Sequence, residues 1–378
     1  MAFSKRVYRS LPFELVEEIL KKTPAESLNR FKSTCKQWYG IITDKRFMYN
    51  HLDHSPERFI RIDDHKTVQI MDPMTGIFSD SPVPDVFRSP HSFASMVHCD
   101  GLMLCICSDS SYERTREANL AVWNPVTKKI KWIEPLDSYY ETDYFGIGYD
   151  NTCRENYKIV RFSGPMSFDD TECEIYEFKS DSWRTLDTKY WDVYTQCRGV
   201  SVKGNMYWIA DTKEKFILRF DFSMETFKNV CVCPPIGCTG RLGCFSGDRL
   251  SLLLQDTDFG GEEEVSTDIA VWLTNKLSDE VVSFTKYFNV TSPHLPLLQC
   301  HGDMARPGYF IGDHKNILAW CEGEVEEDDK WYTCITLYQI DQCGIRKQIE
   351  TGRHRSFRYL DPFICSYVYV PSLIPVPE

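Results

Sequence analysis

The sequence lacks the long apolar runs that mark proteins inserted in a membrane. No stretch of its 378 residues reaches the roughly 18 apolar positions that a spanning helix needs. The first ten residues, MAFSKRVYRS, also lack the apolar core of a secretory signal. We therefore expect a protein of the cytoplasm, the nucleus or both, with no membrane partner.

Cysteine is too sparse and too irregularly placed to predict a disulfide scaffold or a zinc site. The 16 cysteines are about 4% of the chain, against the roughly 8–10% of disulfide-rich proteins. No Cys-x-x-Cys pair occurs, and the closest pairs, Cys105/Cys107 and Cys231/Cys233, are spaced as neighbours on one face of a strand. We expect packed, reduced thiols, with no metal and no cofactor.

Basic residues are scarce beyond the first fifty positions. Residues 1–50 hold ten Lys/Arg and five Asp/Glu, which leaves 33 basic against 50 acidic residues in the remainder. Binding to nucleic acid needs Lys and Arg clustered on one face, because phosphates dominate the affinity. The sequence therefore predicts no nucleic-acid partner.

Catalytic motifs are missing as well. No glycine-rich phosphate loop leads from a strand into a helix, and "GCTGRLG" (237–243) has the composition of a turn. No carboxylate pair of recognisable spacing appears, and no histidine lies beside an obvious nucleophile. We expect a non-catalytic protein.

What the sequence does contain is a short helical segment ahead of a long strand-rich one. Leu11, Leu15, Val16, Ile19 and Leu20 recur at helical spacing, with glutamates on the polar face. Thr23-Pro24 ends this helix and opens the next. A second apolar stripe follows from residue 28 to residue 42, so that three short helices are predicted over residues 1–50.

Fifty residues with so few large apolar side chains make a poor core of their own, so something else must cover the stripe. Periodicity alone favours packing against the downstream domain. However, the order of residues closely resembles the F-box, a helical module of ubiquitin-ligase receptors. That resemblance implies a Skp-type adaptor as partner and, through it, a cullin scaffold. The positions that it assigns to adaptor binding are Leu11, Pro12, Ile19, Leu20, Leu28, Phe31, Cys35 and Trp38.

After about residue 55 the sequence consists of short runs of Val, Ile, Tyr, Trp and Phe separated by turn residues, which is typical of all-β proteins. Turn signals predict hairpins at 98–105, 201–210, 245–254 and 312–321. A weak repeat combines an apolar strand, an Asp/Asn/Ser/Pro turn and an aromatic or bulky residue that opens the next strand. Six such units occur, at 68–78, 120–132, 173–186, 217–230, 268–284 and 335–349.

This repeat predicts a mainly β fold, a kelch-like β-propeller of about six blades behind a small α module. The aromatics Trp123, Trp132, Trp183, Phe227 and Trp272 would then pack between blades. The region is similar to the plant F-box-associated, kelch-like domains, although the double glycine of strict kelch repeats is missing. The expected domains are an F-box at 1–50, a linker at 51–60 and a target-binding propeller at 61–374.

The resemblance implies a substrate-recognition subunit of a cullin-based ubiquitin ligase that recruits a target protein. Exposed Tyr and Trp are common binding anchors, so the expected target contacts are Tyr139, Tyr140, Tyr190 and Trp191. The alternative is a stand-alone propeller with helices that merely cap it. Exposure of Leu11, Pro12, Leu28 and Trp38 in the isolated chain would separate the two hypotheses.

Overall fold

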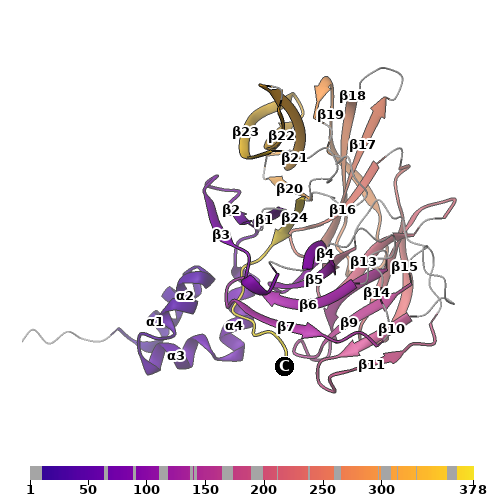
Figure 1. The fold of residues 1–378 in the computed structure, drawn as a ribbon. Helices are drawn as coiled ribbons and strands as arrows, with labels where there is room; N and C mark the ends of the chain where they lie inside the picture. Colours follow the sequence, from indigo (N-terminus) through magenta and orange to yellow (C-terminus); the bar gives the residue numbers. More distant parts are fainter. Residues whose placement is uncertain are drawn as a thin grey trace, which may run out of the picture.

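The computed structural model places four helices beside a ring of six β-sheets (Figure 1). The four helices come first in the sequence, and the strands follow them. The last strand belongs to the same sheet as the first. The residues that the structure describes are 11–63, 67–87, 91–109, 118–136, 139, 143–163, 173–188, 199–210, 212–236, 239–258, 265–296, 298, 308–312, 314–328, 330–355 and 364–378.

The helical module holds four helices in its described part, one more than the sequence predicted. They are α1 (Phe13–Lys21), α2 (Ala25–Phe31), α3 (Lys36–Ile42) and α4 (Lys45–His54). Pro12 and Pro24 stand at the N-caps of α1 and α2, as expected of residues that tolerate a missing donor. The fourth helix begins because a carboxylate oxygen of Asp44 accepts a hydrogen bond of 3.0 Å from the backbone N–H of Phe47.

The six sheets each contain four antiparallel strands and form the blades of a propeller, which confirms the predicted fold class and blade number. A short 3-10 helix, η1 (Asp85–Phe87), connects blades 1 and 2. From the innermost to the outermost strand, the blades are as follows: blade 1, β24 (Ile364–Tyr369), β1 (Arg58–Asp63), β2 (Thr67–Met71) and β3 (Phe78–Pro82); blade 2, β4 (His91–Cys99), β5 (Leu102–Asp109), β6 (Ala118–Asn124) and β7 (Lys129–Ile133); blade 3, β8 (Tyr144–Tyr149), β9 (Tyr157–Phe162), β10 (Cys173–Glu177) and β11 (Ser182–Thr185); blade 4, β12 (Val200–Val202), β13 (Asn205–Ala210), β14 (Phe216–Asp221) and β15 (Thr226–Val232); blade 5, β16 (Thr239–Phe245), β17 (Arg249–Asp258), β18 (Val265–Thr274) and β19 (Phe284–Leu295); blade 6, β20 (Tyr309–Gly312), β21 (Asn316–Glu327), β22 (Lys330–Asp341) and β23 (Gly344–Arg355).

The six repeat units of the sequence are the outer hairpins of the six blades, each made of the third strand, its turn and the fourth strand. Side chains at the start of several of these turns hold the backbone. Asp72 Oδ1 accepts from the N–H groups of Met74 and Thr75, and Asp221 Oδ1 accepts from those of Ser223 and Met224. The weak repeat is therefore a repeat of turn chemistry.

The four predicted hairpins are also real, and they join the first and second strands of blades 2, 4, 5 and 6. Three of them carry two successive residues in the left-handed region: Asp100-Gly101, Lys203-Gly204 and Ser246-Gly247. Positive φ at both central positions matches the right-handed twist of the strands, and glycine at the second position adopts it without strain.

The ring closes through the two ends of the β region, because the late strand β24 pairs with the early strand β1 from Arg58↔Tyr369 to Asp63↔Ile364. Innermost strands of successive blades contact one another: β24 with β4, β4 with β8, β8 with β12, and β12 with β16, while β20 contacts β24. Such closure leaves few free sheet edges. The segment 51–60, expected as a linker, contains the end of α4 and the start of β1, so the connection itself is Ser55-Pro56-Glu57.

Aromatic side chains fill the spaces between blades. Phe227 of blade 4 packs on Phe162 of blade 3 at a ring distance of 5.3 Å, and Trp183 of blade 3 donates its indole N–H to the carbonyl of Glu134 at 2.8 Å. Trp123 is buried against Phe87, while Trp132 contacts the same ring from a more exposed position. These contacts stabilise neighbouring blades against one another.

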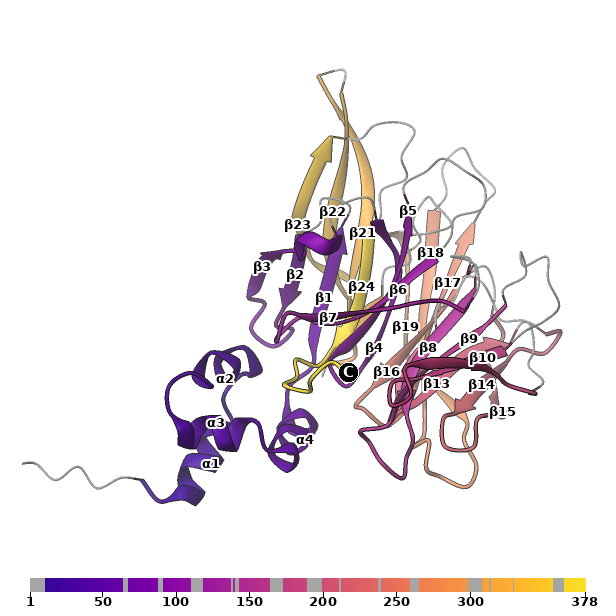
Figure 2. The same cartoon turned by 60° about the horizontal axis from the view of Figure 1, so that its bottom comes forward.

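Beyond β24, the last residues run along blade 2 toward the helices (Figure 2). The side-chain amide of Asn124 donates to the carbonyls of Ser372 and Ile374, and Leu373 and Ile374 are buried. They share one apolar cluster with Leu28 of the helical module. The C-terminal segment therefore joins the helices to the propeller.

Candidate protein-interaction surfaces

The start of the helical module exposes three large apolar side chains, one just ahead of α1 and two on it. Leu11, Leu15 and Ile19 follow each other at a spacing of four residues and are 57, 51 and 55% exposed. Val16 and Leu20, one position further along, lie on the inward side of the same helix and contact the core. We call Leu11, Leu15 and Ile19 the α1 face. Half-exposed leucines and isoleucine in a row are unusual unless another protein covers them.

Two residues assigned to adaptor binding from the sequence do not reach the surface. Leu20 and Leu28 are 1 and 0% exposed, because they lie in the core formed by the helices and the propeller. In the isolated chain these two side chains are therefore not surface contacts, and their assignment to adaptor binding stays a prediction. Both side chains instead support the helices that carry the exposed residues.

The other assigned positions are accessible to different degrees. Pro12 is exposed at the N-cap of α1, and Phe31 and Trp38 are half-buried, with their rings 5.4 Å apart. Cys35 is exposed and also has a local role: its sulfur accepts the backbone N–H of Trp38 at 3.5 Å, at the N-cap of α3. Their positions leave Pro12 and the edges of both rings available to a partner.

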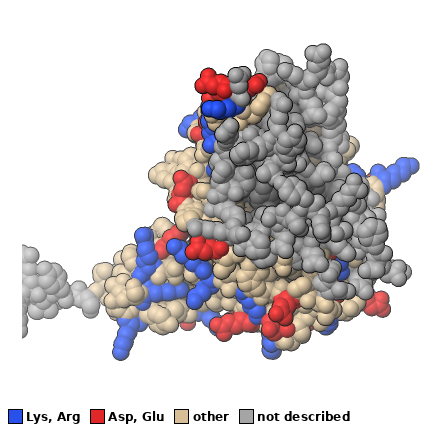
Figure 3. All heavy atoms as spheres, viewed as in Figure 1, with Lys and Arg blue, Asp and Glu red and all other residues tan. Residues whose placement is uncertain are grey.

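Sequence reasoning missed three exposed residues that extend this surface: Phe13, Leu15 and Tyr39. Leu15 could have been found, since it stands four residues from both Leu11 and Ile19. Basic side chains lie over the helices, and both basic and acidic groups lie over blade 6 and along the lower edge of the propeller (Figure 3). The apolar surface is thus set among charged groups, as is typical of an interaction site.

Arg154, in the turn between β8 and β9, connects the helices with two blades. Its Nε and Nη2 donate to the two carboxylate oxygens of Asp100 at 2.8 and 3.0 Å, and its Nη1 donates to Asp53 of α4 at 2.8 Å. The guanidinium also lies 4.9 Å from the ring of Tyr49 and 5.6 Å from that of Tyr149. We call this arrangement the Arg154 bracket.

The charges of the bracket are stabilised by one another. Burial acts to lower the pKa of Arg154, but its hydrogen bonds and attraction to Asp100 raise it overall. Burial, together with the nearby Asp100 carboxylate, raises the pKa of the Tyr49 hydroxyl to about 12. Both groups therefore keep one charge state across the physiological range. The bracket fixes α4 on the propeller through contacts of Arg154 with Asp53 and Tyr49.

The predicted target contacts are only partly within the described residues. Tyr139 is 1% exposed and packs between the Arg161 guanidinium, 4.8 Å away, and the ring of Trp183. Its assignment as an exposed anchor is wrong, because residues from neighbouring strands cover it. Tyr140, Tyr190 and Trp191 lie outside the described residues.

Most of the described thiols are buried or half-buried, whereas Cys35, Cys153 and Cys343 are exposed. Cys105 and Cys107 are buried in β5, and burial raises the pKa of the Cys107 and Cys231 thiols to about 12, so that both stay protonated. Within the described ranges, no group of three His, Cys, Asp or Glu side chains could hold a metal ion. In the same part of the chain, every helix is too short or too polar to cross a membrane.

Two family models match the chain. The F-box domain matches residues 9–50, and the F-box associated beta propeller domain matches residues 52–376. The kelch-like character expected from the sequence has looser support, from relatives such as the putative F-box/kelch-repeat protein At3g17540 of Arabidopsis thaliana, which is 30% identical over 98% of this chain and 94% of that protein.

Two relatives from Arabidopsis thaliana align over nearly the whole chain. F-box protein At3g08750 is 62% identical, with 97% of each chain covered. Putative F-box protein At3g10430 is 52% identical, with 98% of this chain and 99% of that protein covered. Given the helical module, the six-bladed ring and these matches, the chain belongs to the F-box proteins that carry an F-box-associated β-propeller domain.

Proposed function

We propose that this protein is the substrate-recognition subunit of a ubiquitin ligase built on a Skp-type adaptor and a cullin. The observation that carries the proposal is the α1 face, three large half-exposed apolar side chains in the F-box, with Leu11 just ahead of α1 and Leu15 and Ile19 on it. An apolar row of this kind gains free energy when a partner removes it from water. The proposed partner is the adaptor.

Pro12, Phe13 and Tyr39 extend the contact, and Phe31 and Trp38 contribute the accessible edges of their rings. Leu20 and Leu28 hold the helices in place from the core. Of the four residues chosen to separate this proposal from a stand-alone propeller, Leu11 and Pro12 are exposed, Trp38 is half-buried and Leu28 is buried. The exposed pair favours the ligase role.

The propeller would hold a target protein while the F-box holds the ligase. In this role the chain performs no bond chemistry itself. It raises the effective concentration of target lysines near the ubiquitin-charged enzyme, and it would act in the cytoplasm, the nucleus or both. The Arg154 bracket supports this role, since a fixed α4 keeps the target at a set distance and direction from the adaptor.

Co-expression with a Skp-type adaptor tests the proposal. The double variant Leu15→Asp/Ile19→Asp places two charges in the proposed contact, and we expect it to weaken adaptor binding by at least about a hundredfold, since an unpaired carboxylate in an interface costs several kcal/mol. Both positions are exposed in the isolated chain, so the variant should fold.

The matched control is Val281→Asp, which changes an exposed apolar residue of blade 5 and should leave adaptor binding within about twofold of wild type. If the wild-type chain binds no Skp-type adaptor, the proposal fails. If the double variant binds as tightly as wild type, the contact lies elsewhere.

A further inference from the structure

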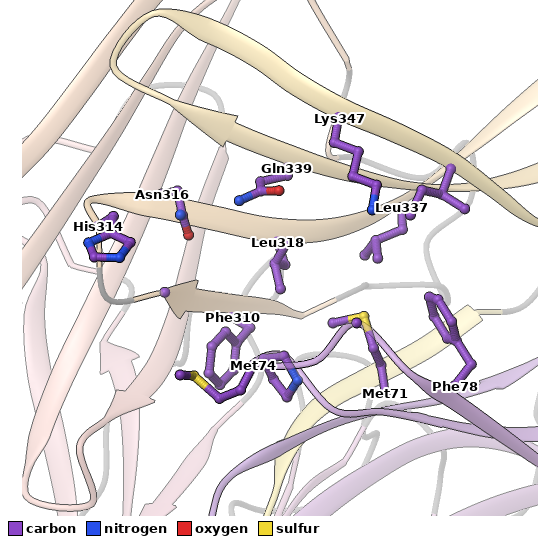
Figure 4. Close-up of a pocket in the computed structure, with 14 residues that line it drawn as sticks. Met71, Met74, Phe78, Phe310, His314, Asn316, Leu318, Leu337, Gln339 and Lys347 are labelled. Atoms are coloured by element: carbon purple, nitrogen blue, oxygen red, sulfur yellow. The ribbon is translucent and has the colours of Figure 1, made fainter.

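A pocket lies where blade 1 meets blade 6. Its volume is about 280 Å³. The turn between β2 and β3 forms one side, and strands β20 to β23 form the other (Figure 4). Side chains from both blades point toward one another across it.

The floor of the pocket is apolar and rigid. Met71 and Leu337 are buried beneath it, and Phe78, Phe310 and Leu318 are half-buried at its walls. All five belong to one cluster that also contains Trp320 and Phe59 at the interface of the two blades. A floor that is part of the core is preformed, so a ligand would lose little free energy in ordering it.

The rim carries four polar side chains: His314, Asn316, Gln339 and Lys347. Within the described part of the chain, none of these four side chains makes a hydrogen bond or an ion pair. Gly312 lets Asn316 approach, because a Cβ at position 312 would lie 2.2 Å from the Asn316 amide oxygen. The rim therefore offers donors that a ligand can use.

The pocket has the opposite charge to the chain as a whole. Lys347 is the one formal charge among its described lining residues, whereas the chain has a net charge of −12. Two carboxylates near in sequence are each bound to an arginine: Asp72 to Arg58 at 3.1 Å, and Asp341 to Arg346 at 2.5 Å. The ammonium group of Lys347 is thus available to an anion.

We propose that this pocket binds an acidic-apolar peptide segment of the target protein. One large apolar side chain, such as Leu, Met or Phe, would enter between Met71, Phe310 and Leu337. An Asp or Glu next to it would pair with Lys347, and the amides of Asn316 and Gln339 would bind peptide groups. The volume supports a single side chain, because pockets for drug-sized ligands span about 300–1,000 Å³. This inference rests on the proposed function, since it specifies what the receptor recognises.

The test uses the full-length chain and a displayed library of random heptapeptides. Enriched peptides are then synthesised with a fluorophore, and their Kd is measured by fluorescence anisotropy. We expect enrichment of sequences with a large apolar residue one or two positions from Asp or Glu, and tighter binding at low salt.

Two pocket variants have matched controls on blade 4. Lys347→Glu reverses the charge on an outermost strand, and Lys228→Glu does the same on β15. Met74→Asp changes the exposed methionine in the outer turn of blade 1, and Met224→Asp changes its counterpart in the outer turn of blade 4. An exposed ion pair contributes up to about fivefold in affinity, and reversal adds a repulsion, so each pocket variant should raise Kd about tenfold. The controls should stay within about twofold.

Three results would overturn the inference: no enriched peptide, enriched peptides that bind the pocket variants and the controls equally well, or competition by free 4-phenylbutanoate at the affinity of the peptide. The last result would assign the pocket to a small carboxylic acid. Binding of a Skp-type adaptor to Lys347→Glu is measured in parallel and should equal wild type. If the chain binds peptides but no adaptor, the peptide-binding inference stands and the ligase proposal fails. If it binds the adaptor but no peptide, the ligase proposal stands and the peptide-binding inference fails.

Discussion

Removal of the guanidinium of Arg154 should loosen α4 from the propeller. Arg154→Met keeps a side chain of similar length but loses two hydrogen bonds to Asp100, one to Asp53 and the stacking on Tyr49. It leaves the largely buried Asp100 carboxylate with the hydroxyl of Tyr157, 3.0 Å away, as its remaining partner in this cluster.

The magnitude follows from burial. Breaking a buried ion pair costs about 3–5 kcal/mol, and a hydrogen bond to a charged group contributes about 1.5–3 kcal/mol. The first figure applies to the Asp100 pair, which joins blades 2 and 3 and is not broken when α4 opens. The attachment of α4 consists of the hydrogen bond to Asp53 and the stacking on Tyr49, and because Arg154 is 28% and Asp53 54% exposed, we expect their loss to cost about 1.5 kcal/mol. That is about tenfold in the equilibrium for opening of this contact.

Hydrogen exchange followed by mass spectrometry measures this opening over residues 45–54. Exchange of these amides should accelerate about tenfold in Arg154→Met. The control is Lys45→Met, which removes an exposed ion pair with Glu155 and should change exchange by less than about fivefold. If the amides of α4 exchange at the wild-type rate in Arg154→Met, apolar packing alone holds the helix and the bracket is not needed.

Two further predictions concern stability, measured as the free energy of unfolding in urea. Burial lowers the pKa of His98 to about 4, and its Nε2 accepts the N–H of Gly101 at 2.9 Å, so the folded ring stays neutral while the unfolded ring binds a proton near pH 6.5. The free energy of unfolding should therefore fall by up to about 3 kcal/mol as the pH drops from about 6.5 to 4. His98→Gln, which cannot titrate, should show a shallower fall over that window. Equal slopes would contradict a neutral His98 in the folded protein. In the hairpin turns, Gly204→Ala should cost about 2 kcal/mol more of the free energy of unfolding than Gly247→Ala. Both glycines have positive φ, but only at position 204 would the new Cβ meet a ring, that of Tyr149, at 2.5 Å. Similar costs for the two variants would show that the ring moves aside.

Much of the propeller could be predicted because its signals are local. Asp72 and Asp221 each accept a hydrogen bond from a backbone N–H two residues further on. Because this turn needs an Asp or Asn at its first position, the same residue types recur there and can be recognised in the sequence. Closure of the ring could not be predicted in this way. Nothing near β24 in the sequence shows that it pairs with β1, since that pairing joins residues some 300 positions apart.

The fourth helix was missed although its capping signal was present. Asp44 precedes α4, and Phe47, Met48 and Leu52 face the core, but Lys45, Arg46 and the polar residues that follow dilute the apolar pattern. The capping residue was therefore a better signal than periodicity in this segment.

The candidate surface was predicted in its location but not in all of its members. α1 carries two apolar pairs at a spacing of four, Leu15 and Ile19 on the exposed side, with Leu11 just ahead of the helix, and Val16 and Leu20 on the other side. Periodicity identifies both pairs, but it does not say which one the rest of the chain covers. Tyr139 failed as a predicted anchor for the same reason, because strands from elsewhere in blade 3 enclose it.

Retention of the full-length chain on an immobilised cullin, with and without a Skp-type adaptor, tests the central proposal most directly. We expect the wild-type chain and Val281→Asp to be retained only when the adaptor is present, and Leu15→Asp/Ile19→Asp to be lost in both conditions. Failure of the wild-type chain to be retained with the adaptor, or retention that does not depend on the adaptor, would contradict the account.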